Sequence, residues 1–186
     1  MRTITITLIS FFIGLSAFAQ TSGTLDLSFG TAGKVLTIVG DTNDLLKDIA
    51  LQTDGKSVAT GFAMNSNAGS SFAIVRYLQN GILDSSFGIN GIVITPVENY
   101  INAVALSIDI QSNGKIIAAG GSGRGPTSDF ILIRYNSNGT LDTAFGTNGI
   151  VITSINNRQS VILSVDIQTD GKIIAAGYST DGGKYN

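Results

Sequence analysis

LDSSFG at residues 83–88 is the stretch that decides the fold, because closely similar stretches flank it at a constant distance. LDLSFG occupies residues 25–30 and LDTAFG occupies residues 141–146, so the motif begins every 58 residues. Self-similarity at a fixed period is the signature of a repeat architecture, in which each repeat forms one structural unit. The sequence therefore predicts a chain built from one unit written almost three times.

A second landmark, a glutamine followed by an Asx-Gly-Lys turn, recurs between apolar runs at residues 52–56, 111–115 and 168–172. Asx-Gly between apolar runs is the strongest short-range signal for a β-hairpin, and a two-residue type I′ turn requires positive φ at both central residues. Such a turn would place Ile110 opposite Ile117, which specifies the register of the whole ribbon.

Two further kinds of strand are predicted in each unit. Short β-branched runs at residues 35–38, 92–95 and 150–153 favour the pleated backbone and are too short for helices. The segments at residues 72–77 and 130–135 are apolar on both faces. Four antiparallel strands that are apolar on both faces form a sheet that must be covered on each side by another such sheet. This predicts an all-β protein of β-propeller type.

The competing architectures are a β-solenoid and a stacked sandwich, but solenoid coils usually take about 20 to 30 residues, which fits 58 poorly. Glycines at the end of the third strand, Gly61, Gly120 and Gly177, would permit tight packing or a change of chain direction in a tapering blade. We expect blade units at approximately residues 25–82 and 83–140, with a truncated unit at 141–186.

Just under three blades are present, whereas a closed propeller typically has four to eight. We therefore expect the chain to be an N-terminal fragment of a longer protein or the product of a partial gene. Its terminal blades would expose their outer faces, and such surfaces favour aggregation or pairing with another copy.

The motifs resemble those of the delta-60 repeat, a bacterial family of secreted β-propeller repeats without an assigned activity. The succession of L-D-x-x-F-G, the Q-x-D/N-G-K hairpin and F-x-x-x-R-Y carries the resemblance over roughly residues 23–178. Thr60 departs from the pattern by replacing alanine, and Asp48 lies two positions earlier than Asp109. The resemblance implies a propeller and secretion, and it carries over no catalytic residues.

Residues 1–19 are predicted to be a secretory signal peptide. Arg2 is followed by an apolar stretch, and Ala17-Phe18-Ala19 gives a small-x-small cleavage pattern. The alternative is a transmembrane anchor, but the apolar run falls short of the roughly 20 residues that span a bilayer. We expect residues 20–186 to form the mature chain, with no further membrane span, secreted from a bacterium or held at its surface.

Composition excludes several function classes. The chain has no His, Cys or Trp, so zinc sites of the usual kind, serine and cysteine nucleophile systems and disulfides are absent. Its 11 basic and 13 acidic residues form no basic stripe, which argues against nucleic acid as a partner. We predict no cofactor, no metal and no catalytic residue. Residues 41–44 vaguely suggest a calcium loop but lack its glycine and distal glutamate.

Recurring positions are interpreted as structural. An arginine inside an apolar strand requires a charge partner, but a two-residue turn at residues 138–139 would place Tyr135, not Arg134, opposite Asp142. A direct Arg134–Asp142 pair would then need a bulge, and Asp109 and Asp166 are the alternative partners. The complete structural set is Asp26, Phe29, Gly30, Gly55, Arg76, Asp84, Phe87, Gly88, Gly114, Arg134, Asp142, Phe145, Gly146 and Gly171.

Segments that differ between units are the candidate binding loops, because loops on a rigid scaffold usually carry function. The segments between strands one and two are residues 39–47, 97–103 and 154–160, and those between strands three and four are residues 63–71, 121–129 and 179 onward. Both sets should lie at one end of the blades. The candidate residues on them are Asp44, Asn65, Tyr100, Arg124 and Arg158. We expect a non-catalytic exported scaffold that binds an unknown protein or glycan. The alternatives are a carbohydrate-active propeller enzyme using Asp and Tyr side chains, and a structural spacer before a sorting domain. Asp41, Asp44 and Glu98 are the acids available for the enzyme alternative.

Overall fold

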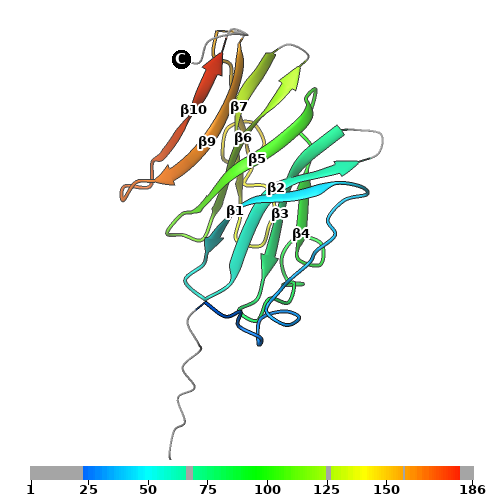
Figure 1. Cartoon of the computed structure of the whole chain (residues 1–186). Helices are drawn as coiled ribbons and strands as arrows, with labels where there is room; N and C mark the ends of the chain where they lie inside the picture. The colour runs from blue at the N-terminus through cyan, green and yellow to red at the C-terminus, as the bar shows by residue number, and fades with distance from the viewer. Residues whose placement is uncertain (1–22, 66–68, 125–126, 157, 181–186) are drawn as a thin grey trace, which may run out of the picture.

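The computed structural model describes residues 23–65, 69–124, 127–156 and 158–180, and all regular structure among them is β-strand (Figure 1). The predicted all-β class is therefore confirmed, and no helix able to cross a membrane occurs among these residues. The strands are β1 (Asp44–Leu51), β2 (Ser57–Asn65), β3 (Gly69–Tyr77), β4 (Ile92–Thr95), β5 (Ile101–Ile110), β6 (Ile116–Arg124), β7 (Thr127–Tyr135), β8 (Ile150–Thr153), β9 (Gln159–Ile167) and β10 (Ile173–Thr180).

The strands form three antiparallel groups that stand side by side. The first sheet has the order β1-β2-β3-β4, and the second group has the order β5-β6-β7-β8. The β9–β10 hairpin is a third group, and a single parallel pair between Ser128 and Gln159 joins it to β7. These groups are blades of propeller type, and they do not close into a ring (Figure 1).

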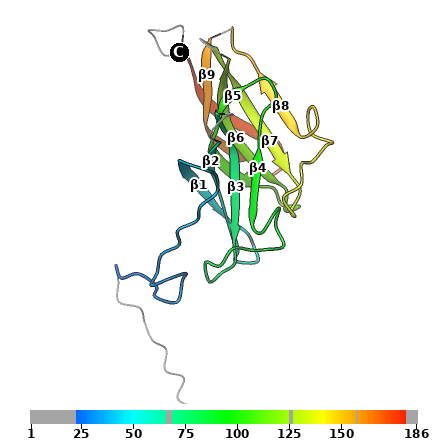
Figure 2. The ribbon, with the colours of Figure 1, turned by 90° about the vertical axis from the view of Figure 1, so that its right-hand side faces the viewer.

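Each blade is offset from the sequence repeat. The fourth strand of the first blade, β4, follows the second copy of the L-D-x-x-F-G motif, and β8 follows the third. Figure 2 shows β4 beside β3 and β8 beside β7. The predicted strands at residues 92–95 and 150–153 therefore form, but each completes the sheet of the repeat before it.

The predicted strand at residues 35–38 is wrong, because this segment has no strand assignment. Its Thr37 hydroxyl accepts a hydrogen bond from Tyr77 at 2.8 Å, as the Thr95 hydroxyl of β4 does from Tyr135. The segment thus lies over the first sheet as β4 lies over the second. Among the described residues, no strand pairs with this segment in a ladder.

The predicted type I′ turns are also wrong, because only the glycine of each Asx-Gly pair has positive φ, as at Gly114. The Gln111 amide bonds the Lys115 carbonyl, and the Gly114 amide bonds the Gln111 carbonyl. These bonds define a type I turn followed by a glycine bulge, a three-residue hairpin loop. Ile110 therefore lies opposite Ile116 and not Ile117.

A β-bulge recurs at the same place in the first strand of every blade. Lys47, Leu106 and Leu163 are each skipped by the ladder. The glycine across the ladder sits directly below the bulged backbone: a Cβ on Gly120 would lie inside van der Waals contact of the Val104 carbonyl oxygen. The tight packing predicted at these third-strand glycines is therefore caused by the bulged backbone of the first strand.

The blades hold together by covering one another's apolar faces. Phe72 and Ile74 of the first blade pack against Ile131 and Ile133 of the second, and all four are fully buried. The opposite face of the second blade packs against the β9–β10 hairpin in a smaller cluster that includes Ile117.

Hydrogen bonds also link neighbouring blades along their first strands. The Asp48 carboxylate accepts bonds from the Ser107 hydroxyl and the Ile108 amide, both at 3.0 Å. The Ser107 hydroxyl in turn accepts a bond from the Val165 amide at 3.2 Å. In the first two blades, the residue that follows the bulge therefore connects its blade to the next one.

Gly120→Ala tests the bulge directly. The added methyl group meets backbone that cannot move without breaking the ladder, so we expect a loss of about 1–3 kcal/mol in the free energy of unfolding, measured by urea denaturation. Gly121→Ala is the matched control, because its Cβ would meet its nearest atom at 3.0 Å, and it should lose less. Equal stability of the two variants would contradict the packing argument.

Candidate binding surface

The recurring arginines and aspartates form ion pairs, of which Arg76–Asp84 is buried and Arg134–Asp142 is partly buried. Arg76 Nε lies 2.8 Å from Asp84 Oδ2, and each residue is 5% exposed. Arg134 Nε lies 2.7 Å from Asp142 Oδ2. The pair is direct because the glycine bulge at Gly139 shifts the register by one residue and brings Tyr135 opposite Leu141. The expectation that Tyr135 faces Asp142 is therefore corrected.

The lysine of the hairpin motif joins each pair, a role that the sequence did not reveal. Lys56 Nζ lies 3.2 Å from Asp84, and Lys115 Nζ lies 2.7 Å from Asp142. The carboxylate of Asp84 also accepts bonds from the Ser86 hydroxyl at 2.6 Å and the Ser86 amide at 3.1 Å. These bonds fold the L-D-x-x-F-G motif into a tight turn, as Asp26 does with Ser28.

The aromatic ring of the same motif lies beneath the arginine. The Arg76 guanidinium is 4.5 Å from the centre of the Phe87 ring, and the Arg134 guanidinium is 4.4 Å from that of Phe145. The glycine that follows has a φ of 53° at Gly88, a left-handed conformation that other residues rarely adopt. The Gly88 amide donates to the Asn138 carbonyl at 2.9 Å, so this motif also contacts the following blade. The remaining glycines of the set have positive φ in turns, namely Gly30, Gly55, Gly114, Gly146 and Gly171.

Local bonding lowers the pKa of these carboxyl groups. The Ser86 hydroxyl is the largest cause for Asp84, with further contributions from the Ser86 amide, Lys56 and Arg76. Lys115 is the largest cause of the lowered pKa of Asp142, followed by Arg134. A glycosidase acid needs a raised pKa, so the aspartates of this framework are poorly suited to act as general acids.

The segments that differ between repeats meet at one end of the blades. The Asp44 carboxylate accepts bonds from the Val39 and Gly40 amides at 2.7 and 2.8 Å, which folds residues 39–44 against the end of β2 next to Asn65. Asn65 pairs with Gly69 across the ladder. The structure thus brings together Asp44 and Asn65, two of the five candidate residues.

Tyr100 and Arg158 occupy corresponding turns one blade apart. The Tyr100 amide bonds the Val97 carbonyl, and the Arg158 amide bonds the Ile155 carbonyl. The Tyr100 hydroxyl donates to Asp129 at 2.6 Å, while the Arg158 carbonyl accepts from the Ser128 amide at 3.3 Å. Both residues therefore lie beside the beginning of β7. The side chain of Arg124 lies outside the described residues.

Tyr100 lines a groove of about 430 Å³. We call it the flank groove, and its apolar lining comes from Val97, Ile150 and Ile152. The complete lining is Val97, Glu98, Asn99, Tyr100, Thr147, Asn148, Ile150 and Ile152. The sequence analysis did not single out Asp129, Thr147 or Asn148 as site residues. The one sequence feature that could have pointed to Asp129 is that the preceding repeat has Ser71 at the same position.

Three segments of the chain, residues 52–87, 111–145 and 168–186, match the family described as domain of unknown function (DUF5122) beta-propeller. These three segments match DUF5122 β-propeller repeats. Each matched segment begins at or next to the glutamine of the hairpin motif, and the first two end in the L-D-x-x-F-G motif. The match therefore covers the residues that build the buried ion pairs. No curated protein matches the chain.

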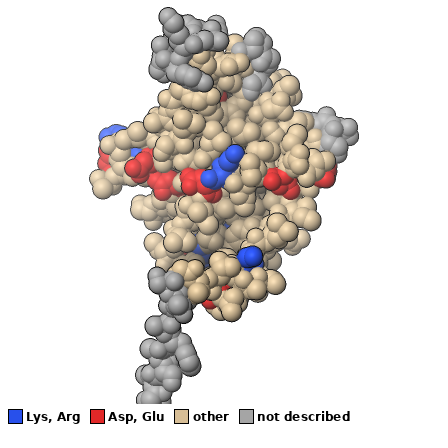
Figure 3. All heavy atoms as spheres, in the orientation of Figure 1, with Lys and Arg blue, Asp and Glu red and all other residues tan. Residues whose placement is uncertain are grey.

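Within the described parts of the chain, no group of three acidic side chains is placed to hold a metal ion. Asp41, Asp44 and Glu98 therefore do not form such a group. A band of carboxylates crosses the face over β9, β5 and β1 (Figure 3). Asp109 and Asp166 each accept a bond from the following backbone amide and do not pair with the arginines.

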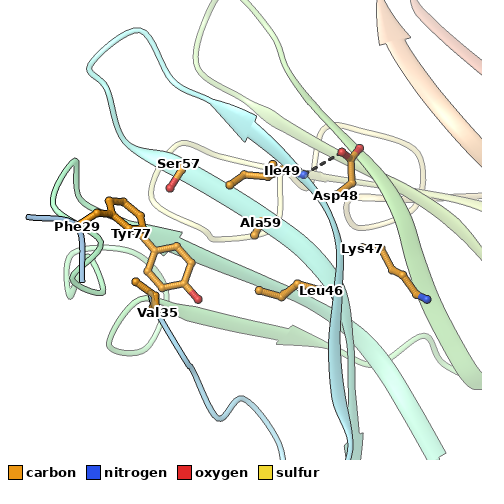
Figure 4. Close-up of a pocket in the computed structure, with 9 residues that line it drawn as sticks. All are labelled: Phe29, Val35, Leu46, Lys47, Asp48, Ile49, Ser57, Ala59 and Tyr77. Carbon is orange, nitrogen blue, oxygen red and sulfur yellow. Dashed lines mark hydrogen bonds between the residues drawn. The ribbon is translucent and has the colours of Figure 1, made fainter. Parts of the chain in front are cut away.

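The first blade carries an apolar groove of about 390 Å³ on the open face of its sheet. Figure 4 shows Leu46, Ile49 and Ala59 on this face together with Tyr77. Phe29 and Val35, which precede the sheet in the chain, line one side. The complete lining is Phe29, Val35, Leu46, Lys47, Asp48, Ile49, Ser57, Ala59 and Tyr77. We call this surface the open face of the first blade.

Asp84→Asn tests the ion pair. Removing the negative charge leaves Arg76 buried with an uncompensated charge, so we expect a loss of about 3–5 kcal/mol in the free energy of unfolding. Asp54→Asn is the control, because Asp54 is exposed and its pair with Lys56 is screened by solvent and should contribute little to stability. Chemical denaturation at pH 7 measures both, and a loss at Asp84 no larger than at Asp54 would refute the structural role.

The stability of the chain should depend on pH through Asp84, and Asp84→Asn should remove this dependence. The pKa of Asp84 is lower in the folded chain than in the unfolded chain, so its stabilisation is complete above the unfolded value of about 4 and declines as the pH falls below it. Between pH 4 and pH 2 the unmodified chain should lose more stability than Asp84→Asn. Parallel curves for the two chains would contradict this.

Proposed function

We propose that the protein is an exported repeat scaffold that binds a glycan or protein partner at or outside the cell surface, without catalysis of its own. We further propose that its DUF5122 repeats are of the delta-60 type. The observation that carries the binding proposal is the division of labour among the side chains. The recurring aspartates and arginines are engaged in ion pairs of the framework, whereas residues 97–100, which differ from residues 155–158, form one side of the flank groove.

The flank groove is held in a fixed shape. The hydrogen bond between Tyr100 and Asp129 anchors the segment at residues 97–100 to the beginning of β7. Val97 is only 4% exposed and belongs to the core between the first two blades. A groove that is formed before its ligand arrives costs little ordering entropy on binding, and this favours affinity.

The chemistry of the flank groove favours a glycan over other ligands. Glu98 and Asn99 are exposed at its rim beside the partly buried Tyr100, and Thr147 and Asn148 lie on the other side. Amides, hydroxyls and a carboxylate next to an aromatic ring offer hydrogen bonds to sugar hydroxyls and an apolar surface for the sugar ring. Its volume lies in the range of small-molecule sites.

A glycan array with the purified chain tests this proposal, followed by titration of each positive glycan. Glu98→Lys should weaken binding about tenfold or more, because it removes a charge-assisted acceptor. Asp54→Lys is the control, since it makes the same charge change at an exposed turn outside the groove, and it should leave the affinity unchanged. Equal weakening by both variants would contradict a site in the flank groove.

The array separates the remaining alternatives. Binding without any change in the bound sugar supports a scaffold, whereas cleavage of an arrayed glycan would favour the carbohydrate-active enzyme. Silence toward every glycan, combined with silence toward extracellular protein extracts, would favour the structural spacer and overturn the binding proposal.

Export is tested by the mass of the secreted protein. Expression in a bacterium should release a chain that begins at Gln20, because the pattern at residues 17–19 fits signal peptidase cleavage. Ala19→Arg should block cleavage, since a large charged residue replaces the small one. Retention of the unmodified chain in the cytoplasm with Met1 in place would contradict the proposal.

A further inference from the structure

The open face of the first blade corresponds, position by position, to a surface that is buried elsewhere in the same chain. The recurring bulge aligns the blades without ambiguity: Leu46 corresponds to Ile162, and Ile49 corresponds to Val165. Ile162 and Val165 are 1% and 7% exposed, whereas Leu46 and Ile49 are 38% and 60% exposed. At these first-strand positions the surface is therefore covered in the third blade and uncovered in the first, whereas Ala59 and Tyr77 of the same groove are already buried.

The covering surface in the buried case is the face of the second blade that carries Ile117 and Ala119. These two residues form one cluster with Ile162 and Val165, and both are fully buried. Ile117 lies opposite Asp109, and Ala119 lies opposite Ser107, so these four residues share the face. This face is the counterpart that the open face of the first blade lacks.

The same counterpart recurs, exposed, on the third blade. Ile174 lies opposite Asp166, and Ala176 lies opposite Ser164, which repeats the arrangement around Ile117 and Ala119. Ile174 is 51% exposed, and Ala176 and Ser164 are exposed as well. We call this surface the open face of the third blade.

A polar contact supports the same match. In the junction between the second and third blades, the Ser107 hydroxyl accepts a hydrogen bond from the Val165 amide. Ser164 stands at the position of Ser107, and Ile49 stands at that of Val165. The two open faces therefore repeat both the apolar and the polar partners of an interface that the chain already forms within itself.

We infer that copies of this chain associate head to tail, with the open face of the third blade of one copy covering the open face of the first blade of another. The occupant is a second copy because the two open faces correspond to the two opposite sides of the junction between the second and third blades. Two copies of the same open face would not reproduce that junction. Such a heterologous interface leaves one open face at each end of a pair, so it forms either closed rings or longer arrays.

Two singly blocked variants test the inference. Ile49→Lys places a charge on the open face of the first blade, and Ile174→Lys places one on that of the third. Both positions are already at least half exposed in the single chain, so folding should be preserved, which circular dichroism and thermal unfolding check. Ile89→Lys is the control, because Ile89 is 81% exposed in a turn away from both faces.

Light scattering after gel filtration gives the readout. The unmodified chain and Ile89→Lys should form oligomers whose size rises with concentration. Each blocked variant alone should be a monomer, and a 1:1 mixture of the two should form a heterodimer and nothing larger, because one unblocked face remains on each. A monomeric unmodified chain at 100 micromolar, or blocked variants that associate as the unmodified chain does, would overturn the inference. A negative glycan array would leave this inference intact, because the flank groove shares no residue with either open face.

Discussion

The structure depends on one constraint: each small sheet is apolar on both faces and is covered only by another sheet of the same kind. Phe72 and Ile74 are fully buried because the second blade lies against them. No single blade removes its apolar surface from water, so stability arises between repeats as much as within them. Polar interactions also cross from one blade to the next. Arg76 donates to the Ser137 carbonyl, and Asp48 accepts from the Ile108 amide.

Short-range rules predicted much of the fold. The period of 58, the β-branched runs and the Asx-Gly turns correctly indicated strands and hairpins. The register failed by one residue because Asx-Gly fits both a two-residue turn and a type I turn with a glycine bulge. That single residue decides whether Arg134 faces Asp142, so the error concealed the direct ion pair. No local sequence feature indicated the bulge at Lys47, since Gly61, the glycine across the ladder that leaves room for it, is distant in the sequence.

The pairing of strands that are distant in the sequence was the other feature that the sequence did not predict. The strand at residues 92–95 was recognised, but its place in the sheet of the preceding repeat depends on which β3 edge is free. For the same reason residues 35–38 were expected to be a strand, although their ladder partner would lie in another blade. At the candidate site, Tyr100 was found because it differs between repeats. Its partner Asp129 was not, because Tyr100 and Asp129 approach only after β5 and β7 are placed in one sheet.

Backbone hydrogen exchange on the Ile174→Lys chain tests the mutual covering of blades most directly, because that chain should remain a single copy in solution. β6 and β7 are covered on both faces, whereas β10 is covered on one. Exchange should therefore be slowest in the amides of β6 and β7, whose opening free energy should equal that of global unfolding. Exchange in β10 should be clearly faster. Equal protection of β10 and β6 would show that each blade is stable by itself and would contradict the account.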